Sequence, residues 1–161
     1  MKRRFFFLAF LFLALSLPLA GCRREPAVSF PAEVSFRAEG TLFQTEVTAE
    51  AVLSATGESR LTLLSPESLA GMTFLCREDG RVFAVRDGQT VQLPGGHPVF
   101  SLFAELTGDR GTPPSPVREG DGWLLREKTA AGTYAAQLSG EGRPLSLSGP
   151  DFSLRVTEVL P

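Results

Sequence analysis

MTFLCREDGRVFAVRDGQTVQL, residues 72–93, is the stretch that decides the fold. Two Asp-Gly pairs, at 79–80 and 87–88, separate three short apolar runs. A type I′ turn needs positive φ at both central residues, so an Asp-Gly pair between apolar runs favours a β-hairpin. The stretch therefore predicts antiparallel strands over 72–78, 81–86 and 89–93. The run from Val82 to Val85 is apolar on both alternating faces, which predicts a strand covered on both sides.

The same signals continue on both sides of this stretch. A third Asp-Gly pair, at 121–122, predicts strands over 117–119 and 123–128. Apolar and polar residues alternate over 33–39 and again over 152–157, as they do in strands with one buried and one wet face. A set of roughly ten short strands with tight connections is typical of an antiparallel sheet. The remaining strands are predicted over 45–54, 60–65, 133–138 and 144–148.

One segment, 98–107, has the period of a helix instead. Its apolar residues recur at the i, i+3, i+4, i+7 spacing: Val99, Leu102, Phe103 and Leu106. Pro98 suits the first turn of a helix and Gly108 suits its end. A helix of this length measures about 15 Å and covers only the centre of a sheet, and an open sheet of about ten strands is expected to curl. The predicted fold class is mainly β (α+β), a strongly curved antiparallel sheet, or half-barrel, with one helix packed on its concave face.

The first 22 residues have the pattern of a targeting signal rather than of a folded element. Three basic residues, Lys2 to Arg4, precede an uncharged stretch from Phe5 to Leu17, which is the pattern of a secretory signal. The sequence Leu19-Ala20-Gly21-Cys22 resembles the lipobox of bacterial lipoproteins, in which the Cys receives a diacylglyceryl group. The resemblance implies a signal peptide over 1–21, a lipidated Cys22 with its tether over 22–31, and a domain over 32–161. An uncleaved membrane-spanning helix is the alternative.

The charge balance changes when the chain is divided at Cys22. Of the 161 residues, the 140 from Cys22 onward carry 13 Lys and Arg against 18 Asp and Glu, a net charge of −5. An acidic surface argues against nucleic-acid binding, because phosphates require a basic face. One His and two Cys in the whole chain argue against most multi-ligand transition-metal sites and against a disulfide framework. We therefore expect no metal and no cofactor.

The sequence offers no constellation for catalysis. It contains no Gly-x-Ser-x-Gly motif, and no nucleophile can be assigned by spacing to the only imidazole, His97. We expect His97 at the start of the helix or on the surface, and Cys76 as a small buried strand residue. Asp79 and Asp121 each adjoin a hairpin Gly, where Asp is selected for turn geometry. The protein is predicted not to be an enzyme.

The order and spacing of these elements resemble one family. Paired strands lead into PESLAGMTF (66–74), and then come the Asp-Gly hairpins, the helix, and a last unit that contains GRPLSL (142–147). This pattern, over residues 32–160, resembles the LolA/LolB-like superfamily of lipoprotein carriers and receptors. The resemblance implies a half-barrel whose concave face, capped by helices, holds acyl chains. The family's N-terminal helix has no counterpart in this pattern, and only one lid helix is predicted.

Two functions remain open at this point. The first is a membrane-anchored, extracytoplasmic lipoprotein that binds an apolar ligand, an acyl chain, a lipid or a lipoprotein, on the outer face of the cytoplasmic membrane or on an outer membrane. The alternative is an envelope interaction or structural protein with a filled core and no ligand. A cavity between helix 98–107 and the sheet favours the first function, and close packing there favours the second. The residues predicted to line such a cavity are Phe36, Phe74, Val99, Phe103, Trp123 and Tyr134.

Overall fold

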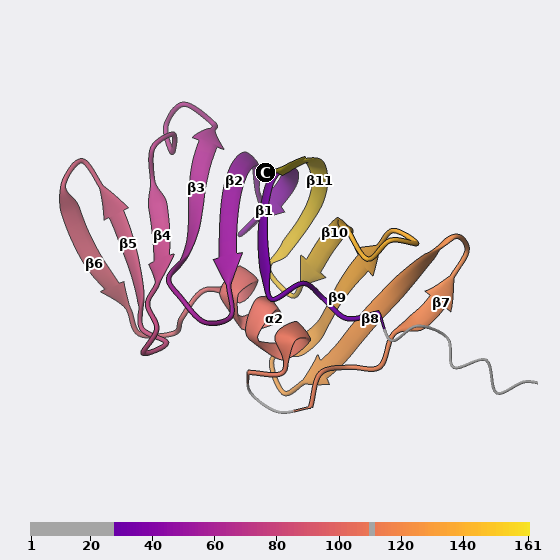
Figure 1. Ribbon diagram of the computed structural model, residues 1–161. Helices are drawn as coiled ribbons and strands as arrows, with labels where there is room; N and C mark the ends of the chain where they lie inside the picture. Colours follow the sequence, from indigo (N-terminus) through magenta and orange to yellow (C-terminus); the bar gives the residue numbers. More distant parts are fainter. Residues whose placement is uncertain (1–27, 110–111) are drawn as a thin grey trace, which may run out of the picture.

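The computed structural model describes residues 28–109 and 112–161, which form one sheet of eleven antiparallel strands and one helix (Figure 1). No helix in this part of the chain is long and apolar enough to cross a membrane. The predicted signal peptide, the lipobox at Leu19, Ala20, Gly21 and Cys22, and most of the predicted tether lie outside the described residues. The elements are β1 (Glu33–Leu42), β2 (Thr45–Ser54), β3 (Ser59–Ser65), β4 (Thr73–Cys76), β5 (Val82–Arg86), β6 (Gln89–Leu93), α2 (Pro98–Thr107), β7 (Val117–Glu119), β8 (Gly122–Thr129), β9 (Gly132–Leu138), β10 (Pro144–Gly149) and β11 (Phe152–Leu160).

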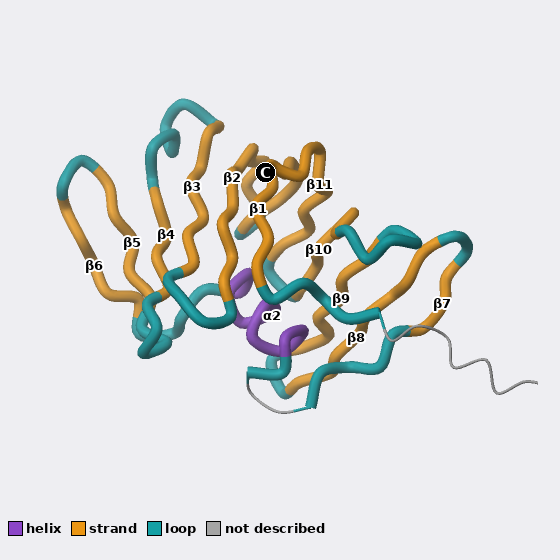
Figure 2. The backbone as a smooth tube through the Cα atoms, in the orientation of Figure 1, coloured by secondary structure: helices purple, strands orange, loops and turns teal. Residues whose placement is uncertain are grey.

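The sheet consists of two meanders, which are joined at its centre by the first strand, β1, and the last strand, β11. β1 to β6 run from the centre to one edge and β11 back to β7 run to the other, in the order β6-β5-β4-β3-β2-β1-β11-β10-β9-β8-β7. β1 pairs with β11, with Phe36 opposite Val159 and Leu42 opposite Phe152. The sheet is curved and unclosed, and α2, which links β6 to β7 in sequence, lies across its concave side (Figures 1 and 2). The predicted fold class is confirmed, with eleven strands where roughly ten are predicted.

The hairpins follow the turn chemistry with some differences in length. Asp87 and Gly88 both have positive φ, 50° and 78°, as a type I′ turn requires. The β4–β5 connection is longer than predicted, because Arg77 donates its N–H to the carbonyl of Arg81 at 3.0 Å and ends β4 at Cys76. The β7–β8 turn is formed by residues 120–121 rather than by the Asp-Gly pair, so β8 already begins at residue 122.

The helix has defined ends and one buried face. His97 is its N-cap, and Gly108, in the left-handed conformation with φ of 79°, ends it. Each fully buried aliphatic or aromatic side chain contributes roughly 1.5–3 kcal/mol relative to an exposed one, so this face holds α2 on the sheet. The buried residues of α2 are Val99, Phe100, Leu102, Phe103 and Leu106.

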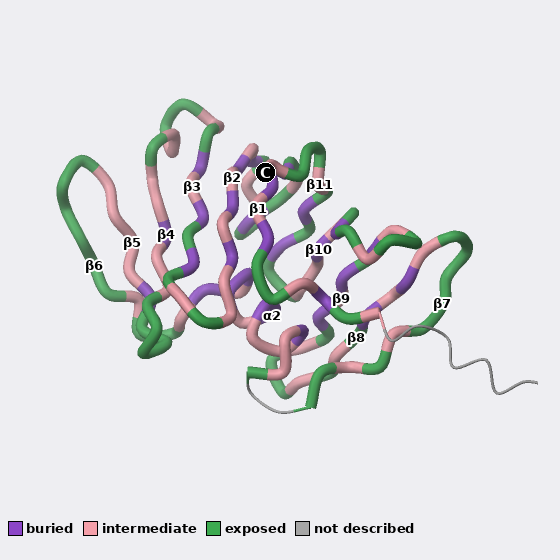
Figure 3. The backbone as a smooth tube through the Cα atoms, in the orientation of Figure 1, coloured by how far each residue is buried: buried purple, intermediate pink, exposed green. Residues whose placement is uncertain are grey.

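Two segments differ from the sequence prediction in how far their side chains are buried. Phe30, assigned to the tether, is buried and packs edge-to-face on Phe103 with ring centroids 5.8 Å apart. The domain therefore begins before residue 32, because this aromatic side chain completes the layer around the helix. In β5, only Val82 is buried, and residues 83–85 are half-buried rather than covered on both sides. The reason is that β5 is the second strand from an edge, where the exposed β6 is its outer neighbour (Figure 3).

Candidate functional site

A cavity of about 300 Å³ lies between α2 and two turns at one end of the sheet. We call it the helix cavity. The helix contributes four residues to it at i, i+3, i+4, i+7 spacing, which is one stripe of a helix surface. The opposite wall comes from the β2–β3 turn, the end of β4 and the β4–β5 turn. The lining residues are Phe100, Phe103, Ala104 and Thr107 of the helix, with Ser54, Ala55, Thr56, Gly57, Ser59, Cys76, Arg77, Glu78, Asp79, Gly80 and Asp109.

The apolar wall of the helix cavity is fixed by the packing of its two phenylalanines. Phe103 is held by the edge-to-face contact with Phe30, and the ring of Phe100 lies 5.3 Å from that of His97. On the other side, Cys76 lies in a strand, as predicted, but it is half-buried rather than buried and borders the cavity. The reason is that Cys76 packs against the hydrophobic core but also faces the helix cavity.

The β2–β3 wall is closed by a buried serine. The Ser59 hydroxyl accepts from the N–H of Ser54 at 2.9 Å and donates to the carbonyl of Ser54 at 3.1 Å. Ser59 is one of two buried polar residues among the described ones, so these bonds satisfy main-chain groups that would otherwise be unpaired. The hydroxyl therefore ties the two ends of the β2–β3 turn together where this wall faces the helix.

The opening of the helix cavity is charged. Asp79 accepts from the side chain of Arg81 at 2.7 Å, and this hydrogen bond lowers the pKa of the Asp79 carboxyl below its usual value. The guanidinium of Arg77 lies 4.4 Å above the ring of Phe83. Arg77, Asp79 and Arg81 are all solvent-exposed, so their ion pairs contribute little to stability. They nevertheless place charges of both signs at the opening.

The six residues predicted to line a cavity are all buried, with 0–8% of their surface exposed. Phe103 lines the helix cavity, and Trp123 lines a separate hollow of about 400 Å³ with Leu138 and Leu145. The others pack in the common hydrophobic core; they are Phe36, Phe74, Val99 and Tyr134. Sequence reasoning missed Phe100, Ala104 and Thr107. The second helical stripe that they share with Phe103 was the available signal.

His97 is in the predicted place but in a different environment. It starts the helix, as predicted, and its Nδ1 accepts from the N–H of Val99 at 3.3 Å. It is not a surface residue, because only 1% of it is exposed and the rings of Phe43, Phe74 and Phe100 surround it. Burial lowers the pKa of the imidazole from 6.5 to about 4. At neutral pH His97 is therefore a neutral helix cap enclosed by aromatic rings.

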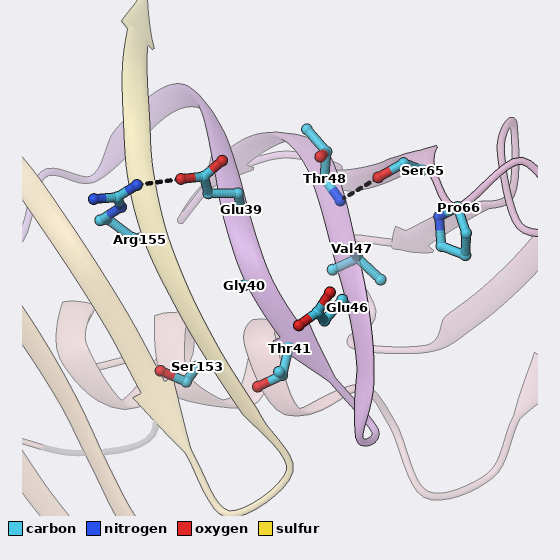
Figure 4. A pocket seen from close by; sticks show the side chains of 10 residues that line it. All are labelled: Glu39, Gly40, Thr41, Glu46, Val47, Thr48, Ser65, Pro66, Ser153 and Arg155. Atoms are coloured by element: carbon cyan, nitrogen blue, oxygen red, sulfur yellow. Dashed lines mark hydrogen bonds and ion pairs between the residues drawn. The ribbon is translucent and has the colours of Figure 1, made fainter.

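A larger hollow of about 740 Å³ lies on the face of the sheet opposite the core, over β1, β2 and β11 (Figure 4). We call it the outer groove. The guanidinium of Arg155 donates to Glu39 across it, and Thr48 donates its N–H to the hydroxyl of Ser65 at 2.9 Å. The hydroxyl and carboxylate groups of this groove can hydrogen-bond a polar ligand. Its lining residues are Glu39, Gly40, Thr41, Glu46, Val47, Thr48, Ser65, Pro66, Ser153 and Arg155.

Over residues 28–109 and 112–161, no three side chains among His, Cys, Asp and Glu are grouped so that they could hold an ion. Asp79, at the opening of the helix cavity, is engaged by Arg81. The helix cavity thus offers apolar contact on its helix side and polar and charged groups on the opposite wall, and the outer groove offers hydrogen bonding.

A single curved, unclosed antiparallel sheet with a helix on its concave side forms an open half-barrel. No protein-family model and no curated protein sequence matches the chain. Among solved structures, the chain is similar to an uncharacterized conserved protein from Thermus thermophilus, with a TM-score of 0.50 and 18% identity over 80% of this chain and 78% of that one. It is also similar to a LolA superfamily protein from Nitrosomonas europaea, with a TM-score of 0.35 and 11% identity over 79% of this chain and 69% of that one. The Thermus structure supports the fold alone.

Proposed function

We propose that this protein is a membrane-anchored, extracytoplasmic lipoprotein whose domain binds one apolar chain, without catalysis, in the helix cavity. The observation that carries the proposal is the stripe of Phe100 and Phe103, which faces a hollow of about 300 Å³. Ligand pockets in proteins range from about 300 to 1,000 Å³, so this one is at the small end. Its size suits a single acyl chain better than a lipoprotein with several.

The chemistry of the two ends of the cavity suits an amphiphile. The apolar part of a ligand would lie against the two phenylalanines and Cys76, where burial stabilises it by about 25 cal/mol per Å². A polar head group would remain at the opening, near Arg77 and Asp79, where both signs of charge meet water. We propose a free fatty acid or a lysolipid as the ligand class on this basis.

The membrane anchor is the second part of the proposal, and it rests on Leu19-Ala20-Gly21-Cys22. A diacylglyceryl group at Cys22 provides two chains, which suffice for stable attachment where one does not. Because Phe30 already packs in the domain, few residues separate it from the anchor. The chain from Cys22 to Val28 reaches about 20 Å at full extension. The domain would therefore work next to the lipid surface, on the outer face of the cytoplasmic membrane or on an outer membrane.

Ligand binding can be tested with the full chain extracted from membranes in mild detergent and titrated with a fluorescent fatty-acid analogue. Ala104→Trp fills the helix cavity from the helix side, whereas Ser101→Trp puts the same side chain on α2 outside the lining. We expect saturable binding to the unmodified chain and to Ser101→Trp, and loss of binding to Ala104→Trp. Equal binding by both variants, or none by the unmodified chain, contradicts the proposal.

The anchor has its own test. Cys22→Ala removes the only thiol in the lipobox-like sequence, and we expect the variant to lose the lipid. Metabolic labelling with a radioactive fatty acid should mark the unmodified chain and not the variant. A label that persists in Cys22→Ala would show that the lipobox interpretation is wrong, whatever the outcome of the ligand titration.

The envelope interaction protein with a filled core remains the second candidate function. It is favoured by the close packing of Phe36, Phe74 and Val99, which leaves the centre of the half-barrel occupied by side chains. Absence of any ligand-dependent change in the titration above favours this function. Its surfaces are the outer groove and the two edges of the sheet.

A further inference from the structure

One end of the curved sheet collects features that lie far apart in the sequence. Glu33, at the start of β1, lies opposite Ser54 at the end of β2, and Leu160, at the end of β11, lies opposite Ser35. The register continues outward through both meanders, so the β2–β3, β4–β5 and β9–β10 turns all lie at this end of the sheet. We call it the tether end, because the described part of the chain begins there.

The chain enters the domain beside the β9–β10 turn. Val28, the first described residue, lies against this turn, with its Cγ1 3.6 Å from the position that a Cβ on Gly142 would take. A few residues further on, the carbonyl of Ala32 accepts from the N–H of Ala55 at 2.8 Å, and Ala55 lines the helix cavity. The entry of the chain and one wall of the helix cavity are therefore neighbours.

The tether end also carries exposed apolar side chains. Leu145 is 48% exposed and Val159 is 44% exposed, and both line one open hollow of about 480 Å³. Val159 lines a second hollow, of about 510 Å³, together with Pro31, so the apolar surface continues to the entry of the chain. Among the charges there, Arg143 is paired with Glu141 at 3.4 Å. An exposed apolar surface rimmed by polar groups is typical of a site that meets a membrane or another protein.

The length of the tether favours the membrane. Six residues, 22–27, separate the proposed lipid from the rest of the described domain, so Val28 can lie at most about 20 Å from the membrane surface. β1 has ten residues, which places the opposite end of the sheet about 30 Å away. The opposite end cannot rest on the bilayer, because Val28 would then lie beyond the reach of the tether. The tether end is held within this reach, and its apolar side chains lose contact with water when they enter the lipid interface.

We propose that the tether end docks on the lipid bilayer, with Leu145 and Val159 in the interfacial region of the lipid. The proposal rests on the anchor of the proposed function and adds to it the surface that meets the membrane. The β2–β3 and β4–β5 turns, which form a wall of the helix cavity, lie at the same end. The cavity therefore opens toward the bilayer, and an acyl chain passes into it from the lipid without crossing open water.

The depth of a fluorophore in the membrane tests the docking. Leu145→Cys and Leu64→Cys would each be introduced into the full chain with Cys76→Ala. Leu64, at the opposite end of β3, is a matched control because it is 41% exposed. The purified lipoproteins would be labelled with a thiol-reactive NBD dye and reconstituted into phosphatidylcholine vesicles that contain a nitroxide on the acyl chains. We expect a blue-shifted and quenched emission from position 145, and the emission of a water-exposed dye from position 64.

The outcomes separate the docking from the anchor. Flotation with the vesicles shows whether the chain is attached to lipid at all, and unchanged thermal unfolding shows that the labelled variants are folded. A chain that floats but has no quenching at position 145, or has equal quenching at both positions, overturns the docking alone. The first of these results is also expected if another protein, rather than lipid, covers the tether end. A chain that does not float overturns the anchor and the docking with it.

Uptake of a ligand from the bilayer tests the direction of the opening. A fluorescent fatty acid would be dissolved in the vesicles that carry the full chain, and its rate of uptake would be followed by the change in its emission. Leu145→Glu combined with Val159→Glu should slow the uptake several-fold and leave equilibrium binding in detergent unchanged, because neither residue lines the helix cavity. Leu64→Glu should change neither. Uptake by the double variant at the rate of Leu64→Glu overturns the proposal. If the unmodified chain takes up no fatty acid, the proposed ligand is wrong, and the quenching alone decides the docking.

Discussion

Acidification is expected to destabilise the domain through His97. The imidazole is enclosed by three aromatic rings, and its Nδ1 caps the helix by accepting from Val99. Protonation would place a charge in this apolar environment and remove the acceptor. Burial accordingly lowers the pKa of His97 from 6.5 to about 4. The folded state therefore holds the neutral form.

The size and sign of the effect follow from the two pKa values. In the unfolded chain His97 has a pKa of about 6.5, so between pH 6.5 and 4 the unfolded state binds more protons than the folded state. The contribution to stability is complete above about pH 6.5 and is lost as the pH falls toward the folded pKa. The loss amounts to about 3 kcal/mol, because a tenfold change in proton affinity corresponds to about 1.4 kcal/mol.

Urea unfolding of residues 24–161 at pH 7 and at pH 4, followed by tryptophan fluorescence, measures this loss. His97→Asn is the comparison, because Asn also serves as an N-cap but does not titrate. The variant should be less stable at pH 7, and the unmodified domain should lose about 3 kcal/mol more than the variant on acidification. Parallel pH profiles, or a His97 pKa near 6.5 by NMR, would refute the reasoning.

Three further substitutions probe the packing. Gly40→Ala, which places a Cβ against the main chain of β11, should cost about 2–4 kcal/mol in urea unfolding, whereas Gly95→Ala, with open space around it, should cost little. Ser59→Ala should cost about 1–3 kcal/mol because it removes the hydroxyl that bonds both the N–H and the C=O of the part-buried Ser54; a cost within error of zero would contradict this. Phe30→Ala should cost about 3–5 kcal/mol and lower the melting temperature by removing the ring packed on Phe103, and an unchanged melting curve would place Phe30 outside the fold.

Most strands and the helix could be predicted from local sequence patterns. The predicted strands agree with the observed ones to within a few residues, because apolar alternation and turn residues act over short distances. The predicted helix over 98–107 agrees to the residue, since proline, glycine and the apolar stripe coincide there. The β1–β2 turn is the exception, because Phe43 and Gln44 adopt positive φ, 50° and 66°, without a Gly or Asn to signal it. There the pairing of two long strands overrides the local preference.

The candidate site is harder to predict because it depends on contacts between distant segments. Phe103 belongs to the helical stripe that faces the sheet, but the helix cavity uses the neighbouring stripe with Phe100. Which of two adjacent stripes faces a hollow depends on the β2–β3 and β4–β5 turns, which no local pattern places in space. The burial of Phe30 and His97 has the same origin, since both are enclosed by residues far away in sequence.

The pairing of β1 with β11 has a consequence for the order in which the chain folds. Each meander is built from neighbouring hairpins and can form early, whereas Ser35 must find Leu160, at the other end of the domain. When the chain is made available N-terminus first, β1 can pair with β2 at once. Its other edge stays unpaired until β11, the last strand, is available. Folding is thus completed only after the whole domain has been released, and until then β1 is the strand most exposed to pairing with other chains.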